Sequence, residues 1–328
     1  MSLVVMKFGG SSVATAESRA AAISHIKKEL ELGNQVVVVV SAMGRRGDPY
    51  ATDTLLSLVK GSDPLMKDLV SSCGETISAC VFADELIENG VPAKPFTGES
   101  AHILTDGTFG KASVTAIETE PIRETLAQGI VPVITGFQGR TSEGETTTLG
   151  RGGSDTSAAL IGGYLQADVV DIYTDVPGIA RADPRIVPGA AFMDSISQHD
   201  MKTLAEWGSL VIHPKAIQAA IDFDVPLLRV RSTFDDEPGT AIGREDTNGF
   251  AGIAVLKDPV NIPEDELDFV KQLPDDYTVI TAVCHDGTEP ELCEEMPVMR
   301  RGDVLHIGVA KAKTAETANK LYNKYIGG

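Results

Sequence analysis

The sequence predicts an α/β protein whose larger part is a three-layer αβα sandwich around a mainly parallel sheet. Strand and helix patterns alternate over the first two-thirds of the chain, and glycine-rich turns follow several strands. The strand expected at 35–41 contains five consecutive valines. We therefore expect it to be buried on both faces, as central strands of parallel sheets are. Alternation of this kind favours a sheet with helices on both sides.

The other elements of this part follow from short apolar runs, which predict strands, and from helical periodicity. Gly90 stands where a C-cap would end the long helix before it. The expected strands are 3–7, 35–41, 93–96, 130–135, 169–174 and 226–230. The expected helices run from the Gly9–Ser12 turn to about Leu32, and over 65–89, 113–128, 156–165 and 201–222, the last with a break at His213-Pro214.

A linker is expected at 232–249, where Asp, Glu, Gly and Pro are frequent and no periodicity is visible. Beyond it a small α+β unit is predicted. Its expected strands are 252–256, 277–284 and 303–310, and its expected helices are 264–272 and 313–325. Because 328 residues exceed the usual size of one domain, we expect two, at 1–240 and 241–328.

The composition excludes some classes of partner. With 28 basic and 47 acidic residues the net charge is −19, which argues against nucleic acid and anionic membranes. No apolar run is long enough to cross a bilayer and no signal-peptide pattern is visible, so a cytoplasmic protein is expected. Cys73, Cys80, Cys284 and Cys293 lack metal-type spacing, and Cys73 and Cys80 are expected to be buried on one helix face.

Residues 151–157 are the strongest candidate for a ligand site. Arg151, two glycines, Ser154 and Asp155 precede an apolar helical run. Ser and Asp are favoured helix caps, and the free amides and dipole of a helix start attract anions. The glycines let a ligand reach the backbone, and Arg151 can hold a carboxylate or phosphate through two bonds. A structural turn would need a glycine and a cap, but not the arginine.

A second candidate lies at the end of the first strand, where Lys7 precedes Gly9, Gly10 and Ser11. Backbone amides at such glycines can surround phosphate oxygens, and a lysine can stabilise the charge that develops during transfer. Neither a GxxxxGK[ST] nor a GxGxxG pattern is present. A glycine turn beside a solvated lysine is the structural alternative.

Further candidates are ambiguous when taken singly. Thr174 and Asp175 follow a strand, where open α/β sheets bind ligands, but turn chemistry explains them equally well. Gly74 inside a helical pattern suggests a close approach, with Glu75 as an acceptor for an ammonium group or as a solvated side chain. Thr52 could cap a helix. Lys215 opens one and could reach a phosphate or solvent.

Taken together, these segments resemble the aspartate kinases of the amino acid kinase family. The resemblance spans Met1 to about Gly243. Related kinases for glutamate, acetylglutamate or UMP share the glycine loop, but not GRGGSDT together with TDVPGI, ADPR and HPKA. The shared segments, in the order of the family, are KFGGSSV, SAMG, TDTLLSL, GETISA, GRGGSDTSA, TDVPGI, ADPRIVP, VIHPKA and VPLLRVRST.

The resemblance implies transfer of a phosphoryl group from Mg-ATP to the side-chain carboxylate of L-aspartate, the first step of lysine, threonine and methionine biosynthesis. Mg²⁺ should be held by phosphates and water, so no protein metal site is expected. The implied roles are catalysis for Lys7 and Asp155, substrate binding for Thr52, Glu75, Arg151, Ser154 and Asp155, and nucleotide binding for Lys7, Gly9, Gly10, Ser11, Thr174, Asp175, Arg185 and Lys215.

Two departures from the family pattern affect these expectations. Ala180 and Arg181 stand where the family often has a bulky residue and a threonine, so nucleotide affinity is expected to differ. Residues 241–328 suffice for one ACT-like regulatory unit or a reduced one, whereas typical aspartate kinases carry two. The resemblance also implies a homodimer. An amino-acid effector at the C-terminal unit stays open, because inhibition by lysine or threonine cannot be carried over to the shortened unit.

Two other functions stay open. The chain could be a non-catalytic amino-acid sensor, which Ala180 and the shorter C-terminal part suggest and the retained Lys7 and Lys215 argue against. It could also be a sister kinase for another small acid. Aspartate binding without ADP formation would indicate the sensor, and a panel of acids would separate the kinases.

Overall fold

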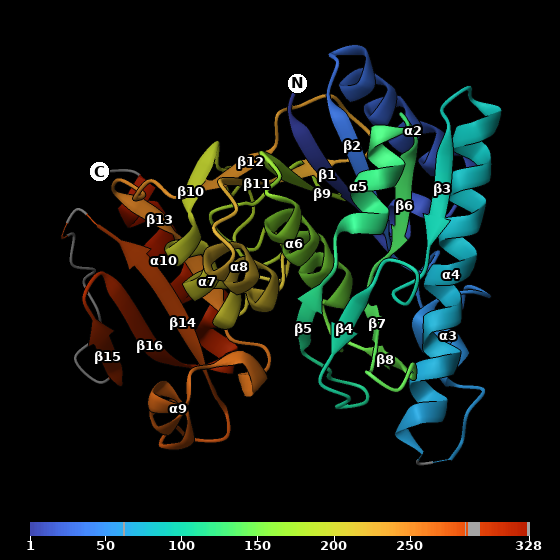
Figure 1. The fold of residues 1–328 in the computed structure, drawn as a ribbon. Coiled ribbons are helices and arrows are strands. Elements are labelled where there is room, and N and C mark those ends of the chain that lie inside the picture. The colour runs from blue at the N-terminus through green and yellow to red at the C-terminus, as the bar shows by residue number, and fades with distance from the viewer. Residues whose placement is uncertain (62, 286, 288–295, 327–328) are drawn as a thin grey trace. The chain divides into compact units, whose positions relative to one another are not determined.

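The structure, a computed structural model, describes residues 1–61, 63–285, 287 and 296–326 (Figure 1). The chain forms two compact units, residues 1–177 with 215–238, and residues 178–214 with 239–328. The first unit therefore ends near the boundary expected at residue 240, but residues 178–214 group with the C-terminal residues. The reason is a shared core, in which Ala182 and Val187 pack in one cluster with Ile280 and Tyr322.

The first unit contains the larger sheet and most of the helices. Its strands are β1 (Leu3–Phe8), β2 (Gln35–Val40), β3 (Ala93–Phe96), β4 (Ile103–Thr105), β5 (Val114–Ile117), β6 (Val131–Thr135), β7 (Gln138–Arg140), β8 (Thr146–Thr148), β9 (Val169–Thr174) and β11 (Leu227–Ser232). Its helices are α1 (Gly10–Val13), α2 (Ala16–Glu31), α3 (Thr52–Leu56), α4 (Pro64–Glu88), α5 (Glu120–Ala127), α6 (Gly153–Leu165) and α8 (Pro214–Asp222).

The main sheet of this unit has the strand order β11-β9-β1-β2-β6-β3, and all neighbouring pairs are parallel. This confirms the predicted α/β fold with a mainly parallel sheet. β1 lies between β2 and β9, and Lys7 is in register with Val39 and Ile172. The carboxyl ends of these strands therefore share one edge, where open α/β sheets bind their ligands.

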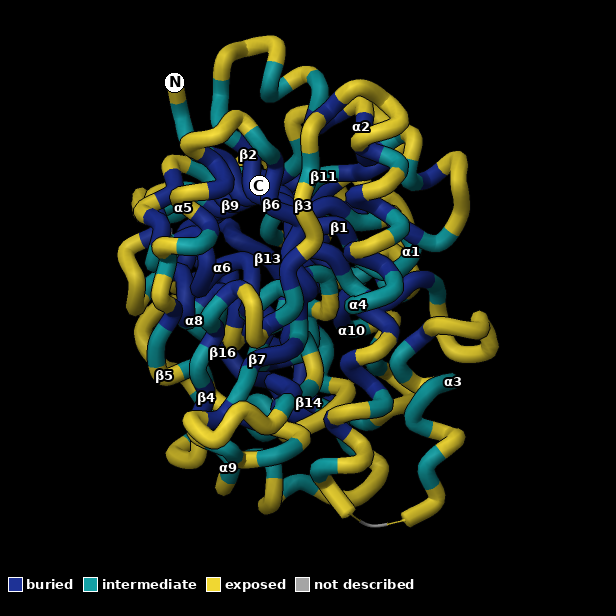
Figure 2. The backbone as a smooth tube through the Cα atoms, turned by 45° about the vertical axis from the view of Figure 1, so that its right-hand side comes forward, coloured by how far each residue is buried: buried dark blue, intermediate teal, exposed yellow. Residues whose placement is uncertain are grey.

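Helices cover both faces of the sheet. Val4, Met6 and Phe8 of β1 share a buried cluster with α2 and α4, through residues such as Ile26 and Phe82. On the other face α6 packs so closely that a Cβ at Gly162 would lie 2.4 Å from Val170. Figure 2 shows the central strands as continuously buried, which explains why β2 needs no polar side.

A smaller mixed sheet has the strand order β5-β4-β7-β8, and its strands come from the chain between β3 and α6. The prediction of a helix at 113–128 is wrong in its first half, because Val114–Ile117 forms β5. Its β-branched residues suit a strand, and Pro121 can stand in the first turn of α5 but not within a longer helix. The strands β4, β7 and β8 have three residues each, which is too short for an alternating pattern to predict them from the sequence.

The second unit is a small α+β unit, as expected. An antiparallel sheet of order β13-β14-β16-β15 packs against α10, with Phe250 and Tyr322 in the shared core. The expected linker is wrong at 240–243, which forms β12 parallel to β10. The elements are β10 (Ser195–Ser197), α7 (Gln198–Glu206), β12 (Thr240–Gly243), β13 (Phe250–Val255), η1 (Pro259–Asn261), α9 (Glu264–Lys271), β14 (Tyr277–Cys284), β15 (Val298–Arg301), β16 (Val304–Ala310), η2 (Lys311–Lys313) and α10 (Thr314–Ile326).

Two further expectations need correction. Cys73 and Cys80 are exposed on α4 rather than buried, whereas Cys284 is buried. Cys293 lies outside the described residues. The helix expected at 201–222 is two helices, α7 and α8, with the second starting at Pro214 as the expected break indicated. Within the part of the chain that the structure describes, no helix combines the length and apolar character needed to span a membrane.

Candidate active site

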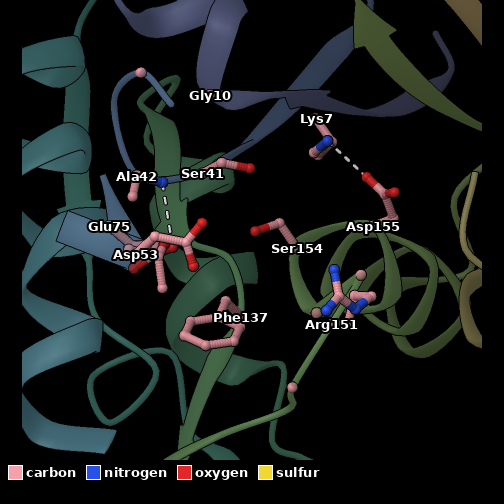
Figure 3. A pocket seen from close by; sticks show the side chains of 15 residues that line it. Lys7, Gly10, Ser41, Ala42, Asp53, Glu75, Phe137, Arg151, Ser154 and Asp155 are labelled. Atoms are coloured by element: carbon pink, nitrogen blue, oxygen red, sulfur yellow. Dashed lines mark hydrogen bonds and ion pairs between the residues drawn. The ribbon is translucent and has the colours of Figure 1, made fainter. Parts of the chain in front are cut away.

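A cavity of about 410 Å³ opens at the carboxyl edge of β1 and lies entirely within the first unit (Figure 3). It brings together segments that are far apart in the sequence, namely β1, the loops after β2 and β6, α3, α4 and the start of α6. The lining residues are Lys7, Gly10, Ser41, Ala42, Gly44, Thr52, Asp53, Glu75, Phe137, Gly150, Arg151, Gly152, Gly153, Ser154 and Asp155.

Lys7 and Asp155 form an ion pair in this pocket, with 2.6 Å between Nζ and Oδ1. The contact is electrostatic, because Asp155 Oδ1 accepts no well-directed hydrogen bond from the described residues. Lys7 is 8% exposed, held between β2 and β9 with its ammonium at the end of β1. The two residues predicted to be catalytic are therefore in direct contact.

The glycine loop after β1 approaches the loop after β2 very closely. The amide of Gly44 donates to the carbonyl of Gly10 at 3.0 Å. A Cβ at Gly10 would lie 2.6 Å from the Gly44 carbonyl oxygen and 2.9 Å from that of Ala42. Glycine is thus required at position 10 for packing of the loops. Gly9 and Ser11 lie beside it but do not line the cavity.

Glu75 presents a buried carboxylate to the pocket. It is 2% exposed; Oε1 accepts from the Ala42 amide at 3.2 Å, and Oε2 has no hydrogen-bond partner in the described structure. Burial raises the pKa of Glu75 to about 8, although the Ala42 amide and the Thr52 hydroxyl act in the opposite direction. The glycine before it permits this placement, since a Cβ at Gly74 would lie 2.7 Å from the Tyr50 carbonyl oxygen.

Arg151 approaches the pocket from a different side than Glu75, with Ser154 between them (Figure 3). It lies in the loop between β8 and α6 and is exposed. Ser154 and Asp155 were expected to cap the helix; instead α6 starts at Gly153 after Gly152, which has φ +70°. The serine and aspartate fall in the first turn, where the helix dipole favours an anionic group. The pocket therefore offers one site for an ammonium group and one for a carboxylate.

Phe137 was not predicted as a site residue, although it lines the cavity. Its φ is +71°, a conformation that bulky residues rarely adopt. The Phe137 amide donates a hydrogen bond to Ser157 Oγ at 3.0 Å, and the Phe137 carbonyl accepts one from the Leu149 amide at 2.8 Å. Strain of this kind collects at functional sites. The available signal was the position of Gly136–Gly139 directly after a buried strand.

Five further residues line the cavity although no role was predicted for them: Ser41, Ala42, Gly44, Asp53 and Gly150. The first three belong to the SAMG segment that follows β2, which carried the family resemblance but no titratable group. Asp53 follows Thr52 and lies in the first turn of α3. All of the residues that were predicted to bind substrate line the cavity: Thr52, Glu75, Arg151, Ser154 and Asp155.

Most of the residues that were predicted to bind the nucleotide lie outside the cavity. Thr174 ends β9 beside the glycine loop, since the Gly9 amide donates to the carbonyl of the preceding Tyr173 at 3.2 Å. Asp175 pairs with Arg45, and Lys215 is exposed in the first turn of α8. Arg185 belongs to the second unit, where its guanidinium contacts Asp183 at 2.7 Å. None of these four lines the cavity, and their roles stay predictions.

A family model described as "Amino acid kinase family" matches residues 2–228. The chain belongs to this family. The matched region includes every residue that lines the cavity and most of the first unit, so the pocket lies within the part of the chain that matches the family.

Within this amino acid kinase family, the chain is similar to aspartokinases. It is 46% identical over 246 residues to aspartokinase 1 of Bacillus subtilis, covering 74% of this chain and 61% of that protein. It is 36% identical over 297 residues to the aspartokinase of Mycolicibacterium smegmatis, covering 89% and 63%. The chain thus spans about three-fifths of the length of the curated relatives that it matches.

Solved structures agree on the fold. The structure of E. coli aspartokinase III in complex with aspartate and ADP has a TM-score of 0.77 at 21% identity and covers 99% of this chain and 100% of that one. Aspartate kinase from Synechocystis has a TM-score of 0.64 at 29% identity and covers 96% of this chain and 54% of that one. The first likeness covers residues of both units.

Proposed function

We propose that this amino acid kinase transfers a phosphoryl group from ATP to the side-chain carboxylate of L-aspartate, giving 4-phospho-L-aspartate. The observation that carries the proposal is a pair of groups of opposite character in the pocket: the buried Glu75, whose Oε2 has no hydrogen-bond partner among the described residues, and the exposed Arg151. An α-amino acid presents an ammonium and a carboxylate that match them. The similarity to aspartokinases from several bacteria supports aspartate as that amino acid.

In this proposal Glu75 holds the ammonium of the substrate and Arg151 its α-carboxylate, with Thr52 and Ser154 beside them. The side-chain carboxylate then lies toward Lys7, whose ammonium faces the charge that develops as the phosphoryl group moves. Asp155 orients Lys7 through their ion pair. Because the acceptor is an ionised carboxylate at neutral pH, no general base is needed, and positioning with charge neutralisation accounts for the catalysis.

The glycine loop after β1 is proposed to receive the phosphates of the nucleotide. Gly10 lines the same cavity as Lys7. Backbone amides of such glycine turns can surround phosphate oxygens. Thr174, Asp175, Lys215 and Arg185 are proposed to contact the nucleotide. Mg²⁺ bound to its phosphates would supply further neutralisation of charge.

The proposal is tested by trapping the acyl phosphate with hydroxylamine, using aspartate, glutamate and acetylglutamate as acceptors. We expect hydroxamate and ADP with aspartate, both dependent on Mg²⁺, and at most a few per cent of that rate with the other acids. Product from glutamate or acetylglutamate instead would reassign the substrate. Calorimetric binding of aspartate without ADP formation would indicate a sensor in place of an enzyme.

We further propose a cytoplasmic homodimer, by analogy with the bacterial aspartokinases that the chain resembles. An amino-acid effector at the C-terminal unit is proposed on the same ground. Sedimentation of the protein tests the first, and addition of lysine or threonine to the hydroxamate assay tests the second.

A further inference from the structure

Asp68 is a buried carboxylate that does not belong to the pocket. It lies on α4, two turns before Glu75, and is 1% exposed. Its carboxylate accepts three hydrogen bonds. Oδ2 accepts from the amides of Gly110 at 2.9 Å and Thr148 at 2.8 Å, and Oδ1 accepts from the Thr148 hydroxyl at 2.8 Å. A buried carboxylate is costly without such donors, so the site is built around this residue.

The donors of these hydrogen bonds belong to the small mixed sheet and its connections. Thr148 is the last residue of β8, and Gly110 lies in the loop between β4 and β5. The Ala112 amide also donates to the Thr148 carbonyl at 2.9 Å, which joins that loop to the strand. Asp68 therefore attaches both the loop and the end of β8 to α4.

Thr148 is followed at once by the loop that carries Arg151. The Leu149 amide donates to the Phe137 carbonyl at 2.8 Å. Gly150 has φ +76°, and a Cβ there would lie 2.9 Å from the Gly110 carbonyl oxygen. The segment between Thr148 and Arg151 is thus short, packed against the Gly110 loop and anchored at its start by Asp68.

A second contact joins the same helix to β7. Gln138 Nε2 donates to the carbonyl of Ser72, on α4 between Asp68 and Glu75, at 3.0 Å. Loss of Asp68 would leave this contact in place. The hairpin of β7 and β8 would stay on α4, while the end of β8 and the loop after it would lose their anchor. The expected consequence is local, at the Arg151 loop.

We propose that Asp68 is a positioning residue that fixes the Arg151 loop at a set distance from Glu75, because it holds the start of that loop on the helix that carries Glu75. A ligand with an ammonium and a carboxylate must contact Glu75 and Arg151 at the same time. The separation of the two groups is therefore what Asp68 controls. The identity of the ligand as aspartate rests on the proposed function.

The kinetic test compares Asp68→Ala with the wild-type enzyme. We expect at least a tenfold rise in the KM for aspartate, with the KM for ATP and kcat within threefold. Asp68→Asn should keep the KM for aspartate close to the wild-type value. Its amide oxygen can accept from both backbone amides, while its NH₂ donates to the Thr148 hydroxyl. Asp84→Ala, at an exposed position of the same helix, is the matched control and should leave all three constants unchanged.

Thr148→Val provides a milder variant in case Asp68→Ala does not fold, since it removes only the hydroxyl. We expect a rise of about threefold in the KM for aspartate, and a larger rise when it is combined with Asp68→Asn, whose NH₂ then lacks its acceptor. An equal rise in both KM values, or an unchanged KM for aspartate in a folded variant, would overturn the proposal.

Hydrogen exchange separates this inference from the proposed function, because it needs no turnover. In Asp68→Ala the amides of Gly110 and of residues 148–152 should exchange at least tenfold faster, while those of β1 and β2 stay unchanged. Asp84→Ala should show neither effect. Faster exchange in a protein that does not phosphorylate aspartate would uphold the positioning role and refute the function. Unchanged exchange at these amides would refute the positioning role.

Discussion

Lys7 and Asp155 contact each other across the pocket, with 2.6 Å between Nζ and Oδ1, and both side chains are largely buried. One residue comes from β1 and the other from the first turn of α6, so the ion pair joins the sheet to the helix that covers it. The pair fixes the ammonium where β1 ends.

Lys7→Ala should therefore act on the chemical step. Removing a group that faces charge developing in the transition state costs about 10²–10³ in kcat. We expect a fall of this size with the KM for aspartate within a fewfold of the wild-type value, measured by the hydroxamate assay. Lys60→Ala removes an exposed lysine outside the pocket and should leave kcat unchanged. Undiminished turnover in Lys7→Ala would show that its assigned role is wrong.

Arg151→Ala should act on substrate binding instead. A hydrogen bond to a charged group contributes about 1.5–3 kcal/mol, which corresponds to roughly a 10- to 150-fold rise in the KM for aspartate. Arg151→Lys keeps the charge but loses the two-pronged geometry, so its KM should be intermediate. The measurement is steady-state kinetics at saturating ATP. A lower kcat with an unchanged KM for aspartate would contradict the assignment.

Aspartate binding should depend on pH through Glu75. Its pKa is raised to about 8 by burial, so at pH 7 the carboxyl is mostly protonated and cannot pair with an ammonium. Binding must then release a proton, and affinity should rise about tenfold from pH 6 to 7, about fivefold from 7 to 8, and level off above. Calorimetry in buffers with different ionisation enthalpies measures this proton release. Glu75→Gln should bind more weakly and lose the pH dependence; binding without proton release in the wild type would contradict the role.

The sequence predicted the strands and long helices of the first unit well, because β2 and its neighbours are apolar on both faces and α4 has a clear start and end. It also singled out residues that line the pocket, since Arg151 and Glu75 stand next to glycines that signal close packing. These residues carry their signal locally, in charge and in glycine position.

What the sequence did not reveal depends on contacts between distant segments. Phe137 lines the pocket through an unusual backbone conformation that no side-chain pattern encodes. Asp68 gives no sign that its partners are at 110 and 148. The strands of three residues form only because a neighbouring strand is present. The grouping of 178–214 with the C-terminal residues likewise follows from a shared core and not from composition.

The two glycines of the first loop should respond differently to alanine. A Cβ at Gly10 would meet backbone oxygens at 2.6 and 2.9 Å, whereas one at Gly9 would lie 3.4 Å from Lys7 Nζ and 3.5 Å from the Tyr173 carbonyl oxygen. Forcing a methyl group into a packed site costs about 1–3 kcal/mol. Gly10→Ala should lose this amount of stability in chemical denaturation together with most of its activity. Gly9→Ala should lose less of both, and equal losses would argue against the close approach at Gly10.

His306 should make the stability of the second unit depend on pH. Its side chain is fully buried on β16 against Trp207, with the rings tilted by 36° and 4.0 Å between their centroids, and Nδ1 lies 2.9 Å from the Thr281 hydroxyl. Nε2 has no hydrogen-bond partner among the described residues. Burial, with a smaller contribution from Arg301, lowers its pKa to about 4. The folded protein therefore keeps this histidine neutral in a range where the unfolded chain protonates it.

The sign and size of the effect follow from that difference in pKa. An unfolded histidine titrates near 6.5, so the contribution is fully present above this pH and is lost as the pH falls toward 4, by about 3 kcal/mol in total. Fluorescence of Trp207, the chain's single tryptophan, reports unfolding of this unit. His306→Asn should flatten the fall in the urea midpoint between pH 7 and 4.5, while His199→Asn, at an exposed position, should keep the wild-type slope. Since carboxylates also titrate in this range, the difference between the two variants isolates His306, and parallel slopes would mean that its burial does not control acid stability.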